Sequence, residues 1–479
     1  MLSRDERDLI ENGEARSFRV SPDPARWALA DLAGRVLSKV SGIPGAEPQV
    51  VRLELPVVDV DPLSWLRAQP SGPKAYWSGR DDGTEVAALG SADLHEGPAP
   101  EKAASLKERL APLLSSGDPR LRYYGGLRFD PDRVTESGWA AFGAYRFVLP
   151  RFEMLFRAGE ARLACNLVLP RDSERREEIL DDIENLALDH EPPGGVLPVP
   201  VSRTDAPDFS DWRKNIDRAL AEFESGRLHK AVLARKTSFG FVEDLDPALL
   251  VRSLKVATPG CFHFYVEPGD GPAFVGASPE RLFRREGRSI MSEAVAGTRP
   301  RGDSAADDEG LRDELLRSAK DRSEHTYVRL SIRESLAPLC ETLAVEEQTS
   351  EMKLASRRHL VSGVRGTLRE GVSDPDVLAA LHPTPAVGGY PKKKALEEIR
   401  SLELFDRGWY AGPIGWIGAD AAEFAVGIRS GLVSDRELAL FSGAGIVAGS
   451  TAEDEWAEIE QKIGEFTRIL GLDPGNGQR

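Results

Sequence analysis

Cysteine is scarce in this sequence: the chain has three cysteines among 479 residues. Cys165, Cys261 and Cys340 lie far apart along the chain, and no Cys-x-x-Cys motif occurs. An odd number of distant cysteines argues against a cysteine zinc site and against a disulfide framework. We therefore expect three buried thiols in a reducing compartment.

Long apolar runs and an excess of basic residues are missing as well. No stretch approaches the roughly 18 apolar residues that span a bilayer, and the charged opening MLSRDERDLIENGE lacks the apolar segment of a secretory signal. The formal net charge is −16 and the basic residues form no long run, which argues against nucleic acid and against a membrane surface as partners. The sequence thus predicts a cytoplasmic protein. An anionic ligand would need a local set of cations or a metal ion.

The chain is long enough to bury a large core, since 41% of its residues are hydrophobic. Residues 1–190 alternate helical and extended patterns and end in a predicted helix over 172–188. Residues 191–207 are rich in proline and glycine, which predicts a linker but not a full domain boundary. Residues 208–470 form the second half of the chain, and 471–479 form a short tail.

Extended patterns dominate the second half. Four consecutive strands are predicted: 261–266, 273–276, 281–285 and 289–295. Their connections are too short for crossover helices, which predicts an antiparallel meander. A helical region over 307–339 and an extended segment over 424–433 follow. This order of elements predicts an α+β protein with extensive antiparallel sheet and helices packed outside.

The stretch 437–470 carries a clear helix signal. After an apolar run, the residues 442–445 (Ser-Gly-Ala-Gly) predict a glycine-rich turn, and Ser450 or Thr451 can then cap a helix. The core stripe of this helix is predicted from residues at helical spacing: Trp456, Ile459, Ile463, Phe466 and Leu470.

Two carboxylates and an ammonium group share another face of that helix. Glu455, Glu458 and Lys462 lie roughly 80° round from the core stripe, at the buried edge of the helix. The ordinary interpretation is an ion pair between Glu458 and Lys462 on a half-exposed face, which would stabilise the helix by roughly a few tenths of a kcal/mol. The alternative is a functional site.

A second acid pair, Asp321 and Glu324 in the segment KDRSEHTYVRL, has the same helical spacing. Two such pairs brought face to face suit Mg²⁺, which prefers oxygen ligands and keeps several waters. The alternative is a set of solvated helix faces, because acid pairs arise often in a chain with 78 acidic residues.

Lys230 lies within a predicted strand over 228–235, where alternation places it on the apolar face. A lysine there costs desolvation free energy unless it is paired or neutral, and functional sites are a common place for one. The alternative is an edge strand with Lys230 in solvent. Glu280, at a strand end, is a candidate acid partner. The segment Ala296–Gly302 offers glycine N–H groups and two arginines, which form either an oxyanion cradle or an exposed basic loop.

Together these segments resemble the chorismate-utilising enzymes, which include isochorismate, anthranilate, aminodeoxychorismate and salicylate synthases. The motifs that carry the resemblance spread in family order over residues 208–470: LHKAVLARK, FVGASPERLFR, EAVAGTRPRG, KDRSEHTYV, HPTPAVGGYP, AVGIRSG and FSGAGIVAGSTAEDEWAEIEQK. In the first half, KAYWSGRDDGTEVAALG and YYGGLRFD resemble, less closely, the amino-terminal part of menaquinone-type isochorismate synthases.

The resemblance implies one chorismate-binding fold, a sandwich of two large antiparallel sheets to which both halves of the chain contribute. It also implies Mg²⁺ held by Glu324 and Glu458, with Asp321 and Glu455 in support. The metal ion would hold the ring carboxylate of the substrate. The remaining implied contacts of the substrate are Arg429, Lys462, the backbone around Gly297, Thr298 and Gly443, and His382 beside the ring and the leaving hydroxyl.

The implied reaction depends on a few positions. Some aminodeoxychorismate synthases carry a lysine nucleophile where this chain has Ala296, and anthranilate and salicylate synthases typically have threonine where it has Ala386. This pattern resembles the isochorismate synthases, in which Lys230 would activate a water that attacks C2 while Glu280 protonates the departing C4 hydroxyl. The long first half favours a role in menaquinone synthesis. Alternatives are a salicylate synthase, an anthranilate or aminodeoxychorismate synthase large subunit, and an inactive relative. The chain contains no glutaminase half, so no amidotransferase partner is expected.

Overall fold

The computed structural model describes residues 24–40, 47–58, 60–100, 102–115, 118–188, 194–355 and 357–472. The charged opening segment and residues 473–479 of the predicted tail lie outside the described residues, as does part of the predicted linker. Among the described residues, no helix combines the length and the apolar character that a bilayer span requires. All three cysteines are buried and form no disulfide, as the sequence predicts.

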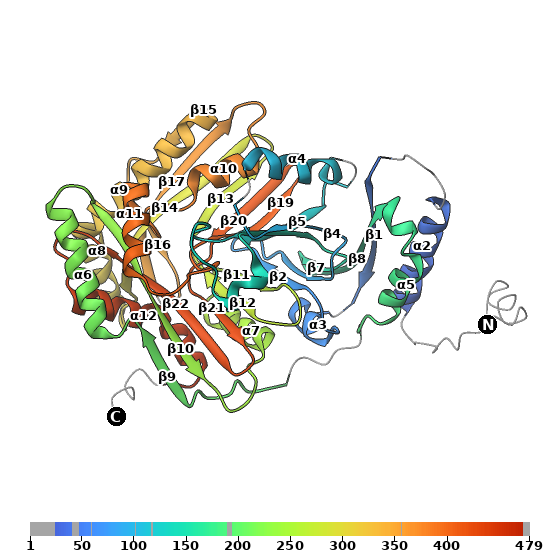
Figure 1. Ribbon diagram of the computed structural model, residues 1–479, viewed down its shortest axis with the longest axis horizontal. Coiled ribbons are helices and arrows are strands. Elements are labelled where there is room, and N and C mark those ends of the chain that lie inside the picture. Colours follow the sequence, from blue (N-terminus) through green and yellow to red (C-terminus); the bar gives the residue numbers. More distant parts are fainter. Residues whose placement is uncertain are drawn as a thin grey trace, which may run out of the picture.

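Two large antiparallel sheets form the body of the molecule, which confirms the predicted sandwich (Figure 1). The first sheet has, in spatial order, the strands β1 (Gln49–Val57), β8 (Glu160–Leu169), β7 (Phe152–Arg157), β3 (Glu85–Leu89), β2 (Lys74–Ser78), β11 (Phe262–Glu267), β12 (Ala273–Ser278), β21 (Ser430–Ser434), β22 (Glu437–Ile446), β10 (Lys230–Gly240) and β18 (Gly389–Tyr390), with β9 (Ser202–Ala206) paired to β10. The second has β15 (Cys340–Val345), β17 (Arg357–Leu368), β14 (Ser289–Pro300), β13 (Arg281–Glu286), β20 (Ala421–Val426), β19 (Pro413–Gly418), β5 (Arg122–Leu127), β6 (Tyr145–Leu149) and β4 (Asp93–Gly97), with β16 (Ser350–Lys353) paired to β17.

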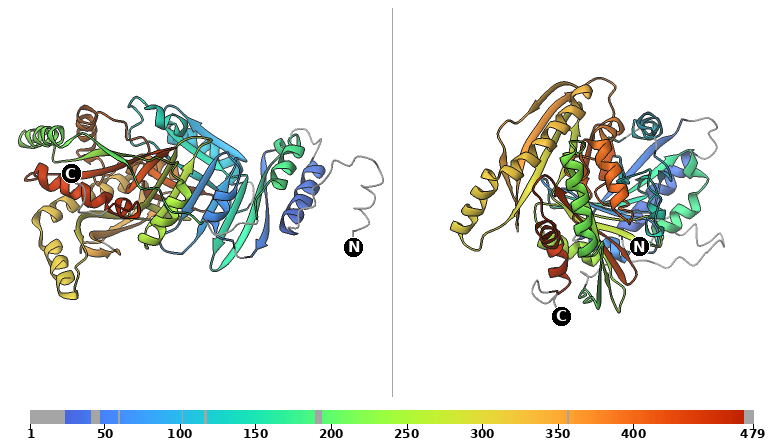
Figure 2. Two further views of the ribbon diagram at one scale, coloured as in Figure 1. Left: turned by 90° about the horizontal axis from the view of Figure 1, so that it is seen from below. Right: turned by 60° about the vertical axis from the view of Figure 1, so that its left-hand side comes forward.

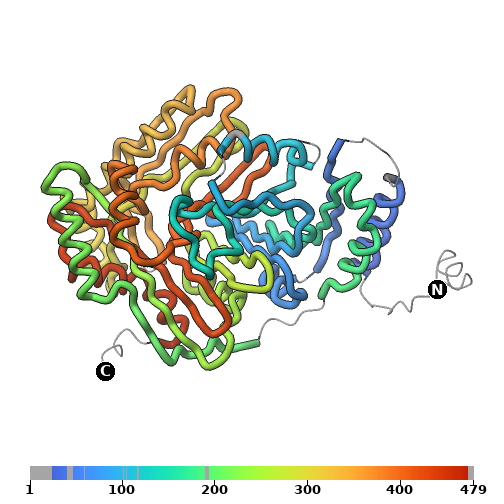
Figure 3. Tube along the Cα trace, viewed as in Figure 1, coloured from blue at the N-terminus to red at the C-terminus, as the bar shows by residue number. Residues whose placement is uncertain are grey.

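Both halves of the chain contribute strands to both sheets. In the first sheet β2 pairs with β11, and in the second β5 pairs with β19, so strands distant in sequence lie side by side (Figure 3). The predicted linker is not wholly irregular, because its last part forms β9, which pairs with β10. The two halves therefore share one sandwich.

Helices cover the outside of the sandwich. They are α2 (Pro24–Val40), α3 (Pro62–Ala68), α4 (Ala103–Leu114), α5 (Arg176–Glu184), α6 (Phe209–Glu224), α7 (Pro247–Ala257), α8 (Ala305–Arg317), α9 (Ala319–Leu336), α10 (Asp374–Leu381), α11 (Lys392–Leu402) and α12 (Ala452–Ile469), with short 3₁₀ turns η1 (Ser137–Phe142), η2 (Arg171–Ser173) and η3 (Ala337–Leu339). Helices α2 and α5 lie at one end of the molecule, whereas α6, α8 and α12 lie at the other (Figure 2).

The hydrophobic core lies between the two sheets. Aromatic side chains such as Phe264 and Phe274 of the first sheet and Phe283 and Phe424 of the second belong to one buried cluster. On α12, the predicted stripe is confirmed, since Ile459, Ile463, Phe466 and Leu470 are buried and Trp456 packs against the core.

The predicted meander is wrong at its middle connection. Strand β12 ends at Ser278 in the first sheet, and β13 begins at Arg281 in the second, so the chain crosses between the sheets through Pro279 and Glu280. A proline has no N–H with which to extend either hydrogen-bond ladder, which accounts for the break there. The extended segment 424–433 crosses in the same way, between β20 and β21.

Three further element predictions differ from the structure. The glycine-rich residues 442–445 form the end of strand β22 and not a turn. The helical region 307–339 is divided at Ser318, whose side chain caps α9 by accepting a hydrogen bond from Asp321 N. The helix predicted over 172–188 is α5 alone, preceded by the turn η2. The division at Ser318 matters most, because it places the acid pair in the first two turns of a new helix.

Candidate active site

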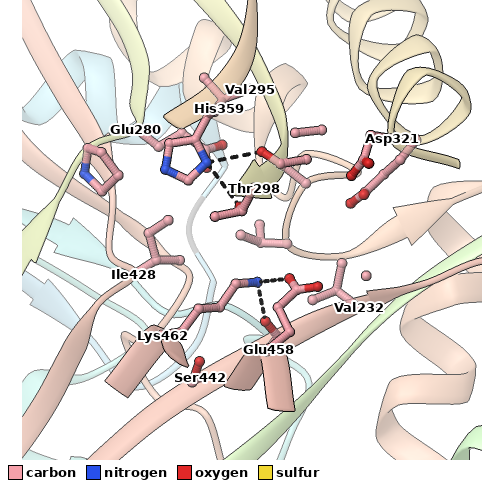
Figure 4. Close-up of a pocket in the computed structure, with 18 of the residues that line it drawn as sticks. Val232, Glu280, Val295, Thr298, Asp321, His359, Ile428, Ser442, Glu458 and Lys462 are labelled. Carbon is pink, nitrogen blue, oxygen red and sulfur yellow. Dashed lines mark hydrogen bonds and ion pairs between the residues drawn. The ribbon is translucent and has the colours of Figure 1, made fainter. Parts of the chain in front are cut away.

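A cavity of about 190 Å³ lies where α9 and α12 meet β14 and β22. Glu280, Thr298 and His359 lie on one side of it, and Lys462 with Glu458 lies on the opposite side (Figure 4). The predicted site residues that line this cavity are Glu280, Gly297, Thr298, Asp321, Glu324, Ala386, Arg429, Gly443, Glu458 and Lys462. Lys230, His382 and Glu455 are not among the lining residues.

Two helices bring three acids to the cavity lining and a fourth, Glu455, close behind it. Asp321 and Glu324 come from α9, and Glu455 and Glu458 come from α12, whose cap is Thr451. Glu455 is 1% exposed. Burial raises the pKa of its carboxyl, and the negative charge of Glu458 adds to that rise. The two predicted acid pairs therefore share one site.

Each of these acids is paired with a cation in the structure. The distances are 2.9 Å from Lys230 Nζ to Glu324 Oε1, 2.7 Å from Lys320 Nζ to Glu455 Oε1, 2.6 Å from Lys462 Nζ to Glu458 Oε1 and 2.9 Å from Arg299 Nη2 to Asp321 Oδ2. Burial alone would raise the pKa of Glu458, but Lys462 together with other nearby cations holds it below its usual value. The ion pairs balance the charge of the acid cluster.

A magnesium ion is compatible with this arrangement. In the part of the chain that the structure describes, no three histidine, cysteine, aspartate or glutamate side chains form a ready-made metal cage. Mg²⁺ does not need one, since it typically binds one or two carboxylates and completes its shell with water and substrate oxygens. The backbone also makes room for the acids: a Cβ atom at Gly445 would lie 2.5 Å from Glu324 Oε1, and one at Gly297 would lie 3.0 Å from Asp321 Oδ1. The residues present therefore fit the ion.

Lys230 and Glu280 are both buried, as an acid and base pair in a functional site would be. Lys230 is 0% exposed, which contradicts the edge-strand alternative, and its side chain lies behind Gly445 of the cavity wall. Glu280 is 6% exposed. Burial raises the pKa of its carboxyl to about 8, although the charge of Lys230 opposes the rise. At neutral pH the Glu280 carboxyl therefore holds a proton that it can donate.

Backbone irregularities shape the wall between the acids and the second sheet. A bulge in β14 lies between Ala296 and Thr298, where Gly297 has a φ of +71°, a conformation that favours glycine. Arg429 adopts a φ of +50° in the connection between β20 and β21, and its Nη1 lies 3.2 Å from Glu465 Oε2. Such strained positions in well-packed surroundings often mark functional sites.

The histidine that lines the cavity is His359, whereas the predicted His382 does not line it. His382 Nε2 lies 3.0 Å from the carbonyl oxygen of Phe129, so its ring is held against the backbone of the first half, away from the cavity lining. His359 lines the cavity. Its Nδ1 lies 3.1 Å from the carbonyl oxygen of Gly297 and 3.0 Å from Thr298 Oγ1, and its buried Nε2 has no hydrogen-bond partner among the described residues. Burial lowers the pKa of its imidazole to about 3, so the ring is neutral.

Sequence reasoning missed other cavity residues as well. His359 sits in β17 directly opposite Thr298, a pairing that links residues 61 positions apart and is not visible in either segment alone. Lys320 neutralises Glu455, and Tyr410 lines the cavity. Arg299, one of the two arginines noted in the segment 296–302, pairs with Asp321 and Glu314. The only sequence signal for Lys320 was its place beside the acid pair in the motif KDRSEH.

Comparison with known proteins identifies the class to which this fold and site belong. A family model described as chorismate binding enzyme matches residues 37–471, so the chain belongs to that family. Isochorismate synthase 2, chloroplastic, of Arabidopsis thaliana is 34% identical and aligns with 95% of this chain and 87% of its own length. The salicylate biosynthesis isochorismate synthase of Pseudomonas aeruginosa is 32% identical, over 89% of this chain and 92% of its own. The solved structure of MenF, the menaquinone-specific isochorismate synthase of Escherichia coli, is 29% identical with a TM-score of 0.79, and the match covers 92% of this chain and 99% of that one.

Proposed function

We propose that this protein is an isochorismate synthase, which interconverts chorismate and isochorismate by adding water at C2 and losing the hydroxyl at C4. The relatives named above support this assignment over most of the chain. The observation that carries it is the buried pair of Lys230 and a protonated Glu280 beside a small cavity lined with acids and cations.

The two buried groups have opposite proton roles in this proposal. Lys230 takes a proton from the water whose oxygen bonds to C2, the ring double bonds shift, and the bond from C4 to its hydroxyl breaks. Glu280 gives its proton to that hydroxyl, which leaves as water. Because its pKa is raised to about 8, Glu280 is still protonated at neutral pH, as a general acid must be.

Lys230 can act as a base only when its amine is uncharged. In the structure its Nζ forms an ion pair with Glu324, at 2.9 Å from Oε1. We infer that this ion pair opens when substrate binds, which frees the amine to accept a proton from water.

We propose that Glu324 and Glu458 would hold Mg²⁺, with Asp321 and Glu455 in support. When bound, the ion supplies the positive charge that holds the ring carboxylate of chorismate beside this acid cluster. Arg429, Lys462 and Thr298 provide the remaining donors for the substrate carboxylates, and all three line the cavity. The unpartnered Nε2 of His359 is available to a hydroxyl group of the substrate.

Ala386 is the residue on which we base the choice of product. It lines the cavity, and its methyl side chain can neither donate nor accept a hydrogen bond that would orient ammonia or the enolpyruvyl ether. The test is chromatography of a mixture of purified protein, chorismate and Mg²⁺ near pH 7.5. We expect isochorismate in equilibrium with chorismate, little salicylate, and no amine that depends on ammonium. Salicylate or anthranilate as the main product would contradict the assignment.

A role in menaquinone synthesis is proposed from the likeness to MenF along nearly its whole length. The relatives also include an enzyme of salicylate biosynthesis, so restoration of menaquinone in a bacterium that lacks its own menaquinone-specific enzyme is the deciding experiment. A cytoplasmic location and the lack of an amidotransferase partner stay predictions.

A further inference from the structure

Glu280 lies in the connection between the two sheets, and the strand ends on either side hold its backbone: Val426 N of β20 donates to the Glu280 carbonyl oxygen at 3.0 Å, and Glu280 N donates to Ser278 Oγ of β12 at 3.2 Å. Pro279 and Glu280 are the two residues between β12 of the first sheet and β13 of the second. A general acid must be held within a few tenths of an ångström of its target, roughly, so contacts to the residues on both sides of Glu280 also bear on its position.

One such contact comes from the first half of the chain. Arg80, in the turn between β2 and β3, donates from Nη1 to the carbonyl oxygen of Pro279 at 2.6 Å. The same guanidinium group donates to Glu293 of β14, from Nη1 at 3.0 Å and from Nη2 at 2.6 Å. Neither Arg80 nor Glu293 lines the cavity. Arg80 therefore holds Pro279, the residue immediately before Glu280, by a hydrogen bond to its backbone.

The residue immediately after Glu280 is held by the same carboxylate. Arg281 is 2% exposed and donates from Nη1 to Glu293 Oε1 at 2.8 Å. It also donates to Glu423 of β20 at 3.1 Å and 3.0 Å, and it pairs with Asp81, the neighbour of Arg80. Glu293 thus connects the contacts on both sides of Glu280.

These contacts are of a kind that fixes geometry. Glu293 is 8% exposed and accepts charge-assisted hydrogen bonds from two guanidinium groups, which are shorter and more directional than neutral ones. Both guanidinium groups lie over the ring of Phe262, at 5.4 Å and 5.3 Å from its centre. Removing one partner of such a buried set leaves an uncompensated charge, so the set holds one arrangement.

We propose that Arg80 is a positioning residue that, through Glu293 and the carbonyl group of Pro279, holds the Glu280 carboxyl toward the cavity. This inference rests on the proposed function, because it requires Glu280 to be the general acid. It gives the GRDDG segment of the first half a place in the chemistry, although no residue of that segment lines the cavity.

The test is a double-mutant cycle of Arg80→Ala and Glu280→Gln, with kcat and KM for chorismate as readouts. Arg80→Ala should lower kcat 10-fold to 100-fold and change KM less than threefold. In the Glu280→Gln background, Arg80→Ala should lower kcat less than threefold, because the acid through which it acts is already gone. Equal factors in both backgrounds, or a kcat within twofold of wild type for Arg80→Ala alone, would overturn the inference. A wild-type kcat for Glu280→Gln would instead overturn the proposed acid role, and the positioning role with it.

Two further variants guard against a general loss of structure. Arg151→Ala is the matched control: Arg151 is a buried arginine that pairs with Asp172 in the first half, and its loss should lower thermal stability without lowering kcat. If Arg80→Ala does not fold, Glu293→Gln takes its place in the cycle, because it keeps the shape of the side chain. Millimolar guanidinium ion should raise kcat of Arg80→Ala several-fold and leave Arg151→Ala unchanged. A lack of rescue together with equal loss in the Arg151 control would assign Arg80 a purely structural role.

Discussion

Replacing Glu280 by glutamine should stabilise the protein, and increasingly so as the pH rises. Burial raises the pKa of the folded carboxyl from 4.5 to about 8, against the lowering effect of Lys230. Between these two pH values the folded protein holds a proton on Glu280 that the unfolded chain has already released. Unfolding therefore releases one proton, and the wild-type protein loses stability as the pH rises.

The magnitude follows from the width of that pH window. One proton released on unfolding costs about 1.4 kcal/mol of stability per pH unit. From 4.5 to about 8 the cost accumulates to roughly 5 kcal/mol and then stays constant. Glutamine carries no charge at any pH. Glu280→Gln should match the wild type near pH 4.5 and exceed it by several kcal/mol, roughly, at pH 8.

The assay is urea unfolding of both proteins between pH 5 and pH 8, without Mg²⁺ and without substrate. Glu437→Gln, which alters an exposed side chain, is the control and should parallel the wild type at every pH. A stability difference between Glu280→Gln and wild type that stays constant with pH would refute the reasoning. It would mean that the Glu280 carboxyl ionises at the same pH in the folded and the unfolded chain. The expected result would identify Glu280 as a residue kept for function at a cost in stability.

Two predictions concern the metal site and the base. We expect Mg²⁺ to raise the thermal unfolding temperature of the wild type, and Glu324→Gln and Glu458→Gln should each abolish turnover and remove that rise. Glu334→Gln on the exposed face of α9 should do neither, and full activity in EDTA would contradict the assignment. Lys230→Ala should lower kcat by about 100-fold or more with a smaller change in KM, because it removes the group that we propose activates water. Lys236→Ala, on the same strand, is its control, and a near-wild-type kcat for Lys230→Ala would place the base elsewhere.

Local sequence patterns were enough to identify the carboxylates on the two helices, but not the strand residues that line the opposite side of the cavity. Helical spacing predicted Asp321, Glu324 and Glu458 on helices, and the structure has them there beside the cavity, since a helix is defined by neighbours three and four positions apart. His359 was missed because its role depends on strand pairing with Thr298. Strand pairing brings distant segments together, and the sequence pattern of one strand alone does not show which residues it will pair with.

The crossing at Glu280 is the second feature that local patterns could not supply. Short connections between strands predict a meander, and the same connection lengths also allow a chain to pass from one sheet to the other. What separates the two cases is which strands of the remaining chain compete for pairing. Here β21 takes the place beside β12, and β20 takes the place beside β13. The decision is made by residues about 150 positions away.

The electrostatics of the cavity explain how a chain with a net charge of −16 can bind a dianion. Each acid of the cluster already has its own cation, so the cavity carries no large excess of either sign before ligands arrive. Adding Mg²⁺ alone would leave two extra positive charges in a partly dry site, and adding the substrate alone would leave two extra negative charges. When Mg²⁺ and the substrate bind together, their charges cancel. Neither ligand then leaves an unbalanced charge in surroundings of low dielectric constant, which would be unfavourable. Under the proposed function, each ligand therefore completes the site that the other needs.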